Sequence, residues 1–98
     1  MEKVYQNALL IELQNSGLSA VKEQPIEVRY SDILVGQYFA DIVVNDLIIL
    51  EIKATKSLLA EHEAQLLNYL KATSFEVGLL LNFGPKPKVM RKAMSAII

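Results

Sequence analysis

The sequence predicts a single domain of the mixed helix-and-strand class (α/β, in the α+β sense), in the order helix, three strands, helix, strand, helix. The chain has 98 residues, enough for one compact domain over residues 1–98 and too few for two. Hydrophobic residues make up 52% of it, so a buried core can form. Apolar residues recur with a helical period in some segments and alternate or run continuously in others. These changes of period, separated by glycine, proline, asparagine and aspartate, give the element order.

The first element is a helix over residues 2–16. Its apolar side chains fall at helical spacing, at Val4, Tyr5, Ala8, Leu9, Ile11 and Leu13. Gly17 is well placed to end the helix in a left-handed cap. No N-cap residue stands ahead of Glu2, so we expect the natural helix to begin further upstream and the chain to be truncated at its N-terminus.

Three strand-length runs follow, at residues 26–30, 35–44 and 47–53. The first alternates apolar and charged residues directly after Pro25, as a half-buried strand does. Gly36 marks a bulge or bend in the second run. Polar breaks at Ser31-Asp32 and Asn45-Asp46 separate the runs, so we expect an antiparallel meander.

The second half of the chain predicts a helix, a strand and a final helix. Ser57 is expected to cap a helix that runs to about Lys71. The apolar run from Phe75 to Asn82 follows that helix and can therefore return as a crossover strand beside the meander. Residues 84–87 contain two prolines that stop this strand, and residues 88–98 are expected to form a helix that serves the core or a dimer surface.

Three charged residues stand inside otherwise apolar strand sequence: Asp41, Glu51 and Lys53. A half-buried carboxylate is tolerated only if it is paired, hydrogen-bonded or bound to a cation. Two ionised carboxylates about 4 Å apart repel by about 4 kcal/mol at an effective dielectric near 20, so the pair shares a proton or holds an ion. Mg²⁺ fits best because it prefers oxygen ligands, and the Ile52 carbonyl could complete the protein's contribution. Lys53 could hold or deprotonate an attacking water.

This site depends on the register of one hairpin. Glu51 and Lys53 share a strand face because side chains alternate. A two-residue turn at Asn45-Asp46 would place Asp41 opposite Leu50, with the two acids on different faces of the sheet. A three-residue loop over 45–47, or a one-residue bulge, would instead place Asp41 opposite Glu51. We therefore predict the longer loop or the bulge.

Two further segments offer polar side chains to this site. His62, Gln65 and Tyr69 are spaced to line one face of the second helix. Gln65 could orient a water or a backbone carbonyl, Tyr69 could donate to a carboxylate or a phosphate, and His62 reads better as a surface residue than as a ligand. Glu2, one turn before Tyr5, could supply a third acid.

Asp41, the run Glu51-Ile52-Lys53 and Gln65-x-x-x-Tyr69, in this element order, resemble the PD-(D/E)XK nuclease superfamily and more closely its small GxxExxY branch. In that branch the name-giving glutamate and tyrosine would be Glu2 and Tyr5, and the glycine would fall before Met1. The resemblance implies a restriction-endonuclease-like core, a mixed sheet with helices on both faces. It further implies Mg²⁺ as the metal ion, with Mn²⁺ as a substitute, and hydrolysis of phosphodiester bonds in nucleic acid. We expect DNA as the substrate in preference to RNA.

Other interpretations of these residues remain open. Glu51 and Lys53 could lie where the strand emerges into solvent and form ordinary pairs with a neighbouring strand, and Gln65 and Tyr69 could form a polar helix flank with a half-buried tyrosine. The chain has one basic cluster, and it could bind phosphate or could simply be the solvent-exposed start of a helix: Lys86, Lys88, Arg91 and Lys92. The chain could accordingly be a catalytically inactive module that binds nucleic acid or a protein, or a structural oligomerisation module.

Composition limits the partners and the compartment. The net charge of −1 gives no general attraction to nucleic acid or to a membrane surface, so a homodimer or a partner protein could complete a binding groove. Cysteine is absent, which excludes disulfides and thiolate metal sites. No apolar run approaches the roughly 18 residues of a membrane span. We expect a cytoplasmic protein with no membrane partner.

Overall fold

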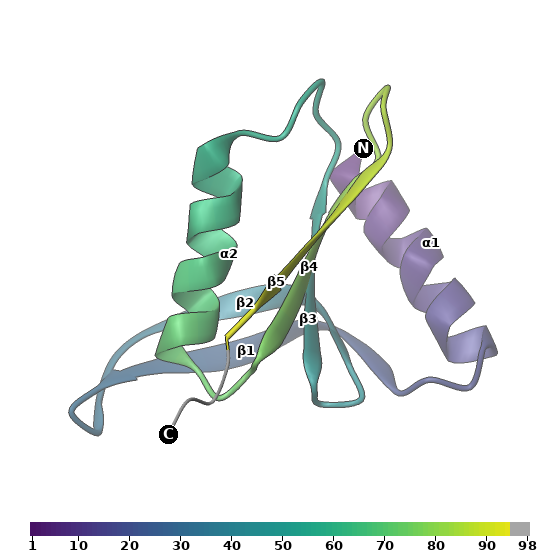
Figure 1. The fold of residues 1–98 in the computed structure, drawn as a ribbon. Coiled ribbons are helices and arrows are strands. Elements are labelled where there is room, and N and C mark those ends of the chain that lie inside the picture. The colour runs from purple at the N-terminus through teal and green to yellow at the C-terminus, as the bar shows by residue number, and fades with distance from the viewer. Residues whose placement is uncertain (95–98) are drawn as a thin grey trace.

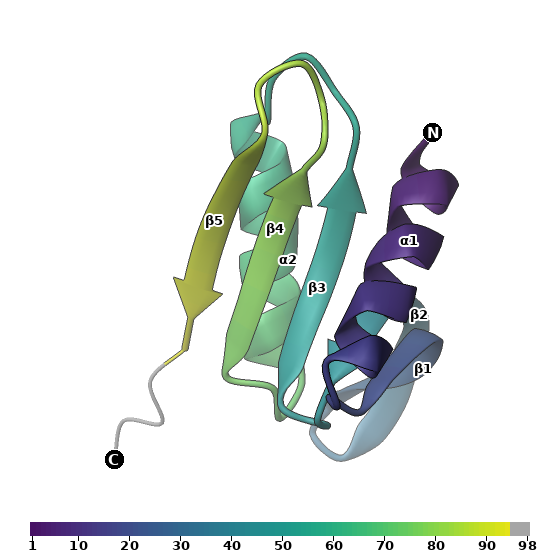
Figure 2. The ribbon, with the colours of Figure 1, turned by 90° about the vertical axis from the view of Figure 1, so that its right-hand side faces the viewer.

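The computed structural model describes residues 1–94 and shows two helices on opposite faces of a five-stranded sheet (Figures 1 and 2). In chain order the elements are α1 (Glu2–Asn15), β1 (Ala20–Tyr30), β2 (Ile33–Val44), β3 (Ile48–Lys53), α2 (Ala60–Ala72), β4 (Val77–Asn82) and β5 (Lys88–Ala93). The strands lie side by side in the order β1-β2-β3-β4-β5. Strands β3 and β4 are parallel and the other neighbouring pairs are antiparallel, so the predicted mixed α+β class is confirmed.

Each helix covers its own apolar core. The core on the α2 side is made of Ile26, Ala40, Val43, Ile49, Leu66, Leu70 and Leu80. The core on the α1 side is made of Ala20, Ile42, Val44 and Leu50, with Leu9, Leu10 and Leu13 of α1 packed on it. Gly78 allows α2 to pack closely on the sheet, because a Cβ atom there would lie 2.8 Å from Cδ1 of Leu66.

The antiparallel meander of β1, β2 and β3 is confirmed, and so is the longer loop between β2 and β3. Val44 pairs with Ile48, and Ile42 pairs with Leu50. The turn is closed by a hydrogen bond of 3.0 Å from the Leu47 N–H to the Val44 carbonyl, and Leu47 itself stands outside the ladder. This extra residue gives the register that brings the two strand acids together.

Strand β1 is longer than the alternating run of residues 26–30, because it begins at Ala20, which pairs with Val44. Half of the residues added are polar, and their pairing with the long β2 overrides their weak strand pattern. A register shift between Val28 and Arg29 leaves Val35 as an extra residue beside Gly36, where a bulge or bend was predicted. The edge position of β1 accommodates Pro25, which has no N–H to donate.

The crossover prediction is confirmed, since β4 returns parallel to β3 after α2. The expected cap of α2 was wrong. Ser57 is held before the helix, where its N–H donates to Oγ1 of Thr55 at 3.0 Å and its carbonyl accepts from the same hydroxyl at 2.6 Å. The N-cap residue is Leu59, whose N–H donates to Nδ1 of His62 at 3.1 Å. His62 therefore has a structural role at the start of α2.

The predicted final helix was wrong over its described part: Lys88–Ala93 form strand β5, antiparallel to β4, and residues 95–98 lie outside the described residues. Met90 and Met94 pack against the core on the α2 side. Their four-residue spacing fits a helix face and a strand face equally well. Pairing with β4 decides between the two, because a strand there satisfies backbone groups that β4 would otherwise leave unpaired.

Within residues 1–94, neither helix has the length and apolar character needed to cross a bilayer.

Candidate active site

The two strand acids are joined through each other's backbone. Extending the β2–β3 register by one residue places Asp41 opposite Glu51. Oε2 of Glu51 accepts a hydrogen bond of 3.0 Å from the Asp41 N–H, and Oδ2 of Asp41 accepts one of 2.7 Å from the Ile52 N–H. The predicted juxtaposition of Asp41 and Glu51 is therefore present, and each carboxylate is oriented by a backbone donor.

Burial disfavours the ionised form of both acids. It raises the pKa of Glu51 to about 7, against an ordinary value of 4.5, although the hydrogen bond from the Asp41 N–H lowers it. The charge of Asp41 raises the pKa of Glu51 further, and Lys53 opposes that effect. Burial also raises the pKa of Asp41, against the hydrogen bond from the Ile52 N–H. A cation between the acids would relieve this unfavourable arrangement.

The donors available fit a hard divalent cation. Among the described residues, hydrogen bonds reach Oδ2 of Asp41 and Oε2 of Glu51, which leaves the other oxygen of each carboxylate available to an ion. The N–H and C=O of one residue point to the same side of an extended strand, so the Ile52 carbonyl lies on the Asp41 side of β3. Two carboxylates and a carbonyl match the partial oxygen shell from which Mg²⁺ is held, with water and substrate oxygens in the other positions.

Glu2 lies near the acid pair without joining it. Its charge raises the pKa of Asp41 and of Glu51, which places it close to both from the first turn of α1. No group of three or more His, Cys, Asp or Glu side chains within residues 1–94 is close enough to hold a metal ion.

Lys53 and the α2 side chains border the acids. Lys53 follows Glu51 by two residues on β3, and its charge lowers the pKa of both acids. Nε2 of Gln65 donates to the Tyr69 hydroxyl at 2.8 Å. Burial and the charge of Glu51 raise the pKa of Tyr69, so its hydroxyl stays protonated near the acids. Asp41 and Glu51 both act on Tyr69, and Lys53 acts on both acids, so the predicted set of two acids, one lysine, Gln65 and Tyr69 lies in one region of the structure.

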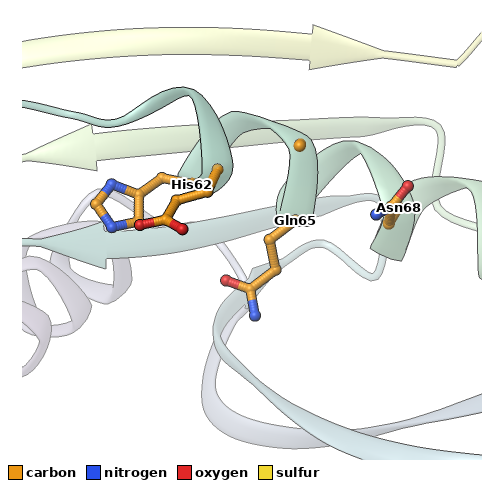
Figure 3. A pocket seen from close by; sticks show the side chains of 5 residues that line it. His62, Gln65 and Asn68 are labelled. Carbon is orange, nitrogen blue, oxygen red and sulfur yellow. The ribbon is translucent and has the colours of Figure 1, made fainter.

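Two hollows lie in this region of the surface. One, of about 380 Å³, runs along α2 and is lined by Glu61, His62, Ala64, Gln65 and Asn68; Figure 3 shows three of these side chains along the helix. The other, of about 430 Å³, is lined by Lys3, Glu23, Phe39 and Asp41. Only the second includes one of the two strand acids, so it is the one that gives a ligand access to the candidate ion site.

Sequence reasoning missed three residues that support the site. The ring of Tyr38 stacks on Tyr69 with centroids 3.7 Å apart, and its buried hydroxyl has no partner among the described residues. Gln6, 4% exposed on α1, donates from Nε2 to the Asp41 carbonyl at 2.9 Å. Asn82 accepts from the N–H groups of Thr55 and Gly84 and donates to the Thr55 carbonyl. The polar Gln6 on the buried side of a helix was a signal that could have been used.

The four basic residues do not form one surface. Lys92 pairs with Glu63 of α2 at 2.8 Å, and alternation along β5 puts Arg91 on the opposite face of the sheet. Lys86 lies in the turn before β5, and Lys88 begins that strand. The helix start on which these residues were expected to lie is therefore absent, and a shared phosphate site is not formed by all four.

The family model of the PD-(D/E)XK nuclease superfamily matches residues 1–94. This chain belongs to the PD-(D/E)XK nuclease superfamily. The fold agrees with that of a solved relative, the crystal structure of SSO0001, at a TM-score of 0.70 and 23% identity. The likeness covers 97% of this chain and 50% of that one, so this PD-(D/E)XK chain spans half the length of the other. Among curated proteins no significant match was found.

Proposed function

We propose that this PD-(D/E)XK chain is a Mg²⁺-dependent nuclease that hydrolyses phosphodiester bonds in nucleic acid. The observation that carries the proposal is the pair Asp41 and Glu51, each held by the other strand and each with a raised pKa. Buried acids with a raised pKa beside a lysine are typical of sites that perform chemistry. Superfamily membership supports the same reaction class.

Asp41, Glu51 and the Ile52 carbonyl would hold the ion. When bound, Mg²⁺ supplies Lewis-acid activation of the phosphodiester and stabilises the charge that develops during displacement. Mn²⁺ prefers the same oxygen ligands and is the expected substitute. The reaction consumes one water, whose oxygen bonds to phosphorus while the bond to one sugar oxygen breaks and that oxygen takes up a proton.

The remaining side chains orient and stabilise. The Lys53 ammonium would hold the attacking water and offset negative charge on the phosphoryl oxygens. The hydroxyl oxygen of Tyr69 already accepts from Gln65, so the hydroxyl proton is free to be donated to a phosphate oxygen. Glu2 would act through its charge on the two acids, consistent with the coupling of its charge to both.

We also place the chain in the GxxExxY branch. Glu2 and Tyr5 stand in the first turns of α1, where Tyr5 stacks on Phe83 with centroids 4.8 Å apart. This contact packs the start of α1 against the end of β4, which keeps Glu2 beside the acids. The cytoplasmic location, DNA as the preferred substrate, and a homodimer or partner protein stay predictions.

Cleavage assays test the proposal. Single-stranded, duplex and branched DNA, and RNA, are incubated with Mg²⁺ or Mn²⁺ and the wild-type chain, Glu51→Gln or Lys53→Ala. Activity is expected in the wild type and is expected to be lost in both variants. Glu12→Gln and Lys71→Ala, at exposed positions of α1 and α2, serve as matched controls that keep activity.

Silence on every substrate, together with no Mg²⁺-induced change in melting temperature, would support the alternative of a catalytically inactive binding module. Sedimentation tests the oligomerisation alternative, which a monomer would contradict; Lys88–Ala93, expected there as part of an apolar helix, form a strand of the sheet.

A further inference from the structure

An exposed aromatic ring lies beside the candidate ion site. Phe39 is 61% exposed on β2, two residues before Asp41. Single exposed apolar residues are common on protein surfaces and by themselves assign nothing. The position of Phe39 is informative because it lines the same groove of about 430 Å³ as Asp41.

The same groove carries a cation. Lys3 of α1 lines it and forms an ion pair with Glu23 of β1, and both side chains are about half exposed, at 59% and 49%. Ion pairs this exposed contribute little to stability, so the Lys3 ammonium can turn to a ligand anion at small cost. The charge of Lys3 also acts on Asp41, which places the ammonium near the candidate ion site.

An aromatic face, an ammonium and a carboxylate that could hold a cation in one groove match the base and the phosphates of a nucleotide. We propose that this groove binds an unpaired nucleotide next to the scissile phosphate, with its base stacked on Phe39 and its phosphate held by Lys3. The inference rests on the proposed function, because it takes Asp41 as an ion ligand. The substrate it implies is single-stranded nucleic acid or the single-stranded end of a duplex.

The requirement for an unpaired base follows from stacking. Inside a duplex both faces of a base are covered by its neighbours, so Phe39 can stack only on a base that is unstacked or terminal. The net charge of −1 also removes the general phosphate attraction on which many duplex-binding proteins depend. Stacking is therefore expected to supply a large share of the affinity.

The absence of tryptophan from the sequence allows a direct optical test. Phe39→Trp introduces a single tryptophan whose fluorescence a stacked base quenches. The matched control is Tyr30→Trp, at the tip of the same β1–β2 hairpin, where Tyr30 is 75% exposed. Both variants are titrated in EDTA with a 12-nucleotide single-stranded DNA, the same sequence as RNA, and a blunt duplex.

We expect quenching of Phe39→Trp by the single strands, little by the duplex, and none of Tyr30→Trp. Phe39→Ala is expected to weaken binding of the single strands roughly 5- to 150-fold, the range typical of one lost base–aromatic stack. Its affinity for the duplex should stay at the wild-type value. A difference between the DNA and RNA titrations identifies which single strand the groove prefers.

Unchanged binding of single strands by Phe39→Ala, or equal quenching of both tryptophan variants, would overturn the inference. Binding in EDTA needs no cleavage, so the two proposals fail separately. If binding depends on Phe39 but no substrate is cleaved, the proposed nuclease activity is contradicted and the proposed nucleotide-binding groove is supported. If cleavage is the same in Phe39→Ala as in the wild type, the nucleotide-binding groove is contradicted and the nuclease activity is supported.

Discussion

Replacing Glu51 by glutamine should stabilise the fold at alkaline pH while removing the function. The pKa of this buried acid is raised from 4.5 to about 7, so between these values the folded chain holds a proton that the unfolded chain has released. The free energy of unfolding therefore falls as pH rises from about 4.5 and reaches its lower level above about 7. Glutamine carries no charge, and its Oε1 can still accept from the Asp41 N–H.

The magnitude follows from the difference between the two pKa values. From 4.5 to about 7, at about 1.4 kcal/mol per pH unit, ionised Glu51 destabilises the fold by about 3 kcal/mol. Glu51→Gln should recover at most this amount at pH 8.5, which for a chain of this length corresponds to a rise in melting temperature of at most roughly 12–24 °C. At pH 4.5 the wild type and the variant should differ little, because both then carry a neutral side chain.

Urea unfolding at pH 4.5, 6, 7 and 8.5 measures this difference directly. The gap between variant and wild type should grow with pH, and the matched exposed variant Glu12→Gln should show no such growth. A gap that is constant across pH, or a variant less stable than the wild type at pH 8.5, would refute the reasoning. Mg²⁺ should stabilise the wild type at pH 8.5 and leave Glu51→Gln unchanged.

The remaining predictions concern the ion and the packing around the site. The rise in melting temperature produced by Mg²⁺ should be larger at pH 8 than at pH 6, because below about pH 7 a proton competes for Glu51; an equal rise at both would count against the site. Gly78→Ala should lower the free energy of unfolding in urea by about 1–3 kcal/mol, because the added Cβ overlaps Leu66. The control Gly36→Ala should not destabilise the chain, because no atom lies within 4 Å of its added Cβ. Asn82→Ala should cost about 1–3 kcal/mol in the same measurement, because it leaves the Thr55 and Gly84 N–H groups without their partner; an unchanged midpoint would argue against this role.

Local sequence sufficed where short-range rules decide the structure. The period of the apolar residues located α1, the meander and the crossover strand, and Gly17 adopts the positive φ of 86° that ends a helix. Asparagine and aspartate at 45 and 46 both take left-handed backbone angles, as turn residues do. The alternation of side chains showed that Asp41 and Glu51 can meet only if the loop between β2 and β3 is longer than two residues. The structure has this longer loop.

Local sequence failed where a long-range contact made the decision. Ser57 has the side chain of a helix cap, but Thr55 holds its backbone in a turn. The N-cap residue is Leu59, whose N–H donates to Nδ1 of His62. The segment after residue 87 has a spacing that suits helix and strand alike, and β4 determined the outcome. Tyr38 gave no local signal, because its role depends on a stack with Tyr69 of α2.

The amino-acid sequence by itself determined the residue types of the candidate site, two carboxylates and an ammonium in strand sequence, and the positions of α1, the β1–β2–β3 meander and the crossover strand β4. These features are local, since they depend on residue type, alternation and turn residues. Only the tertiary structure decided how strongly Glu51 resists ionisation and which side chains surround the acids. Burial and the meeting of Lys3, Phe39 and Asp41 in one groove arise from packing between distant elements, which no short window of sequence contains.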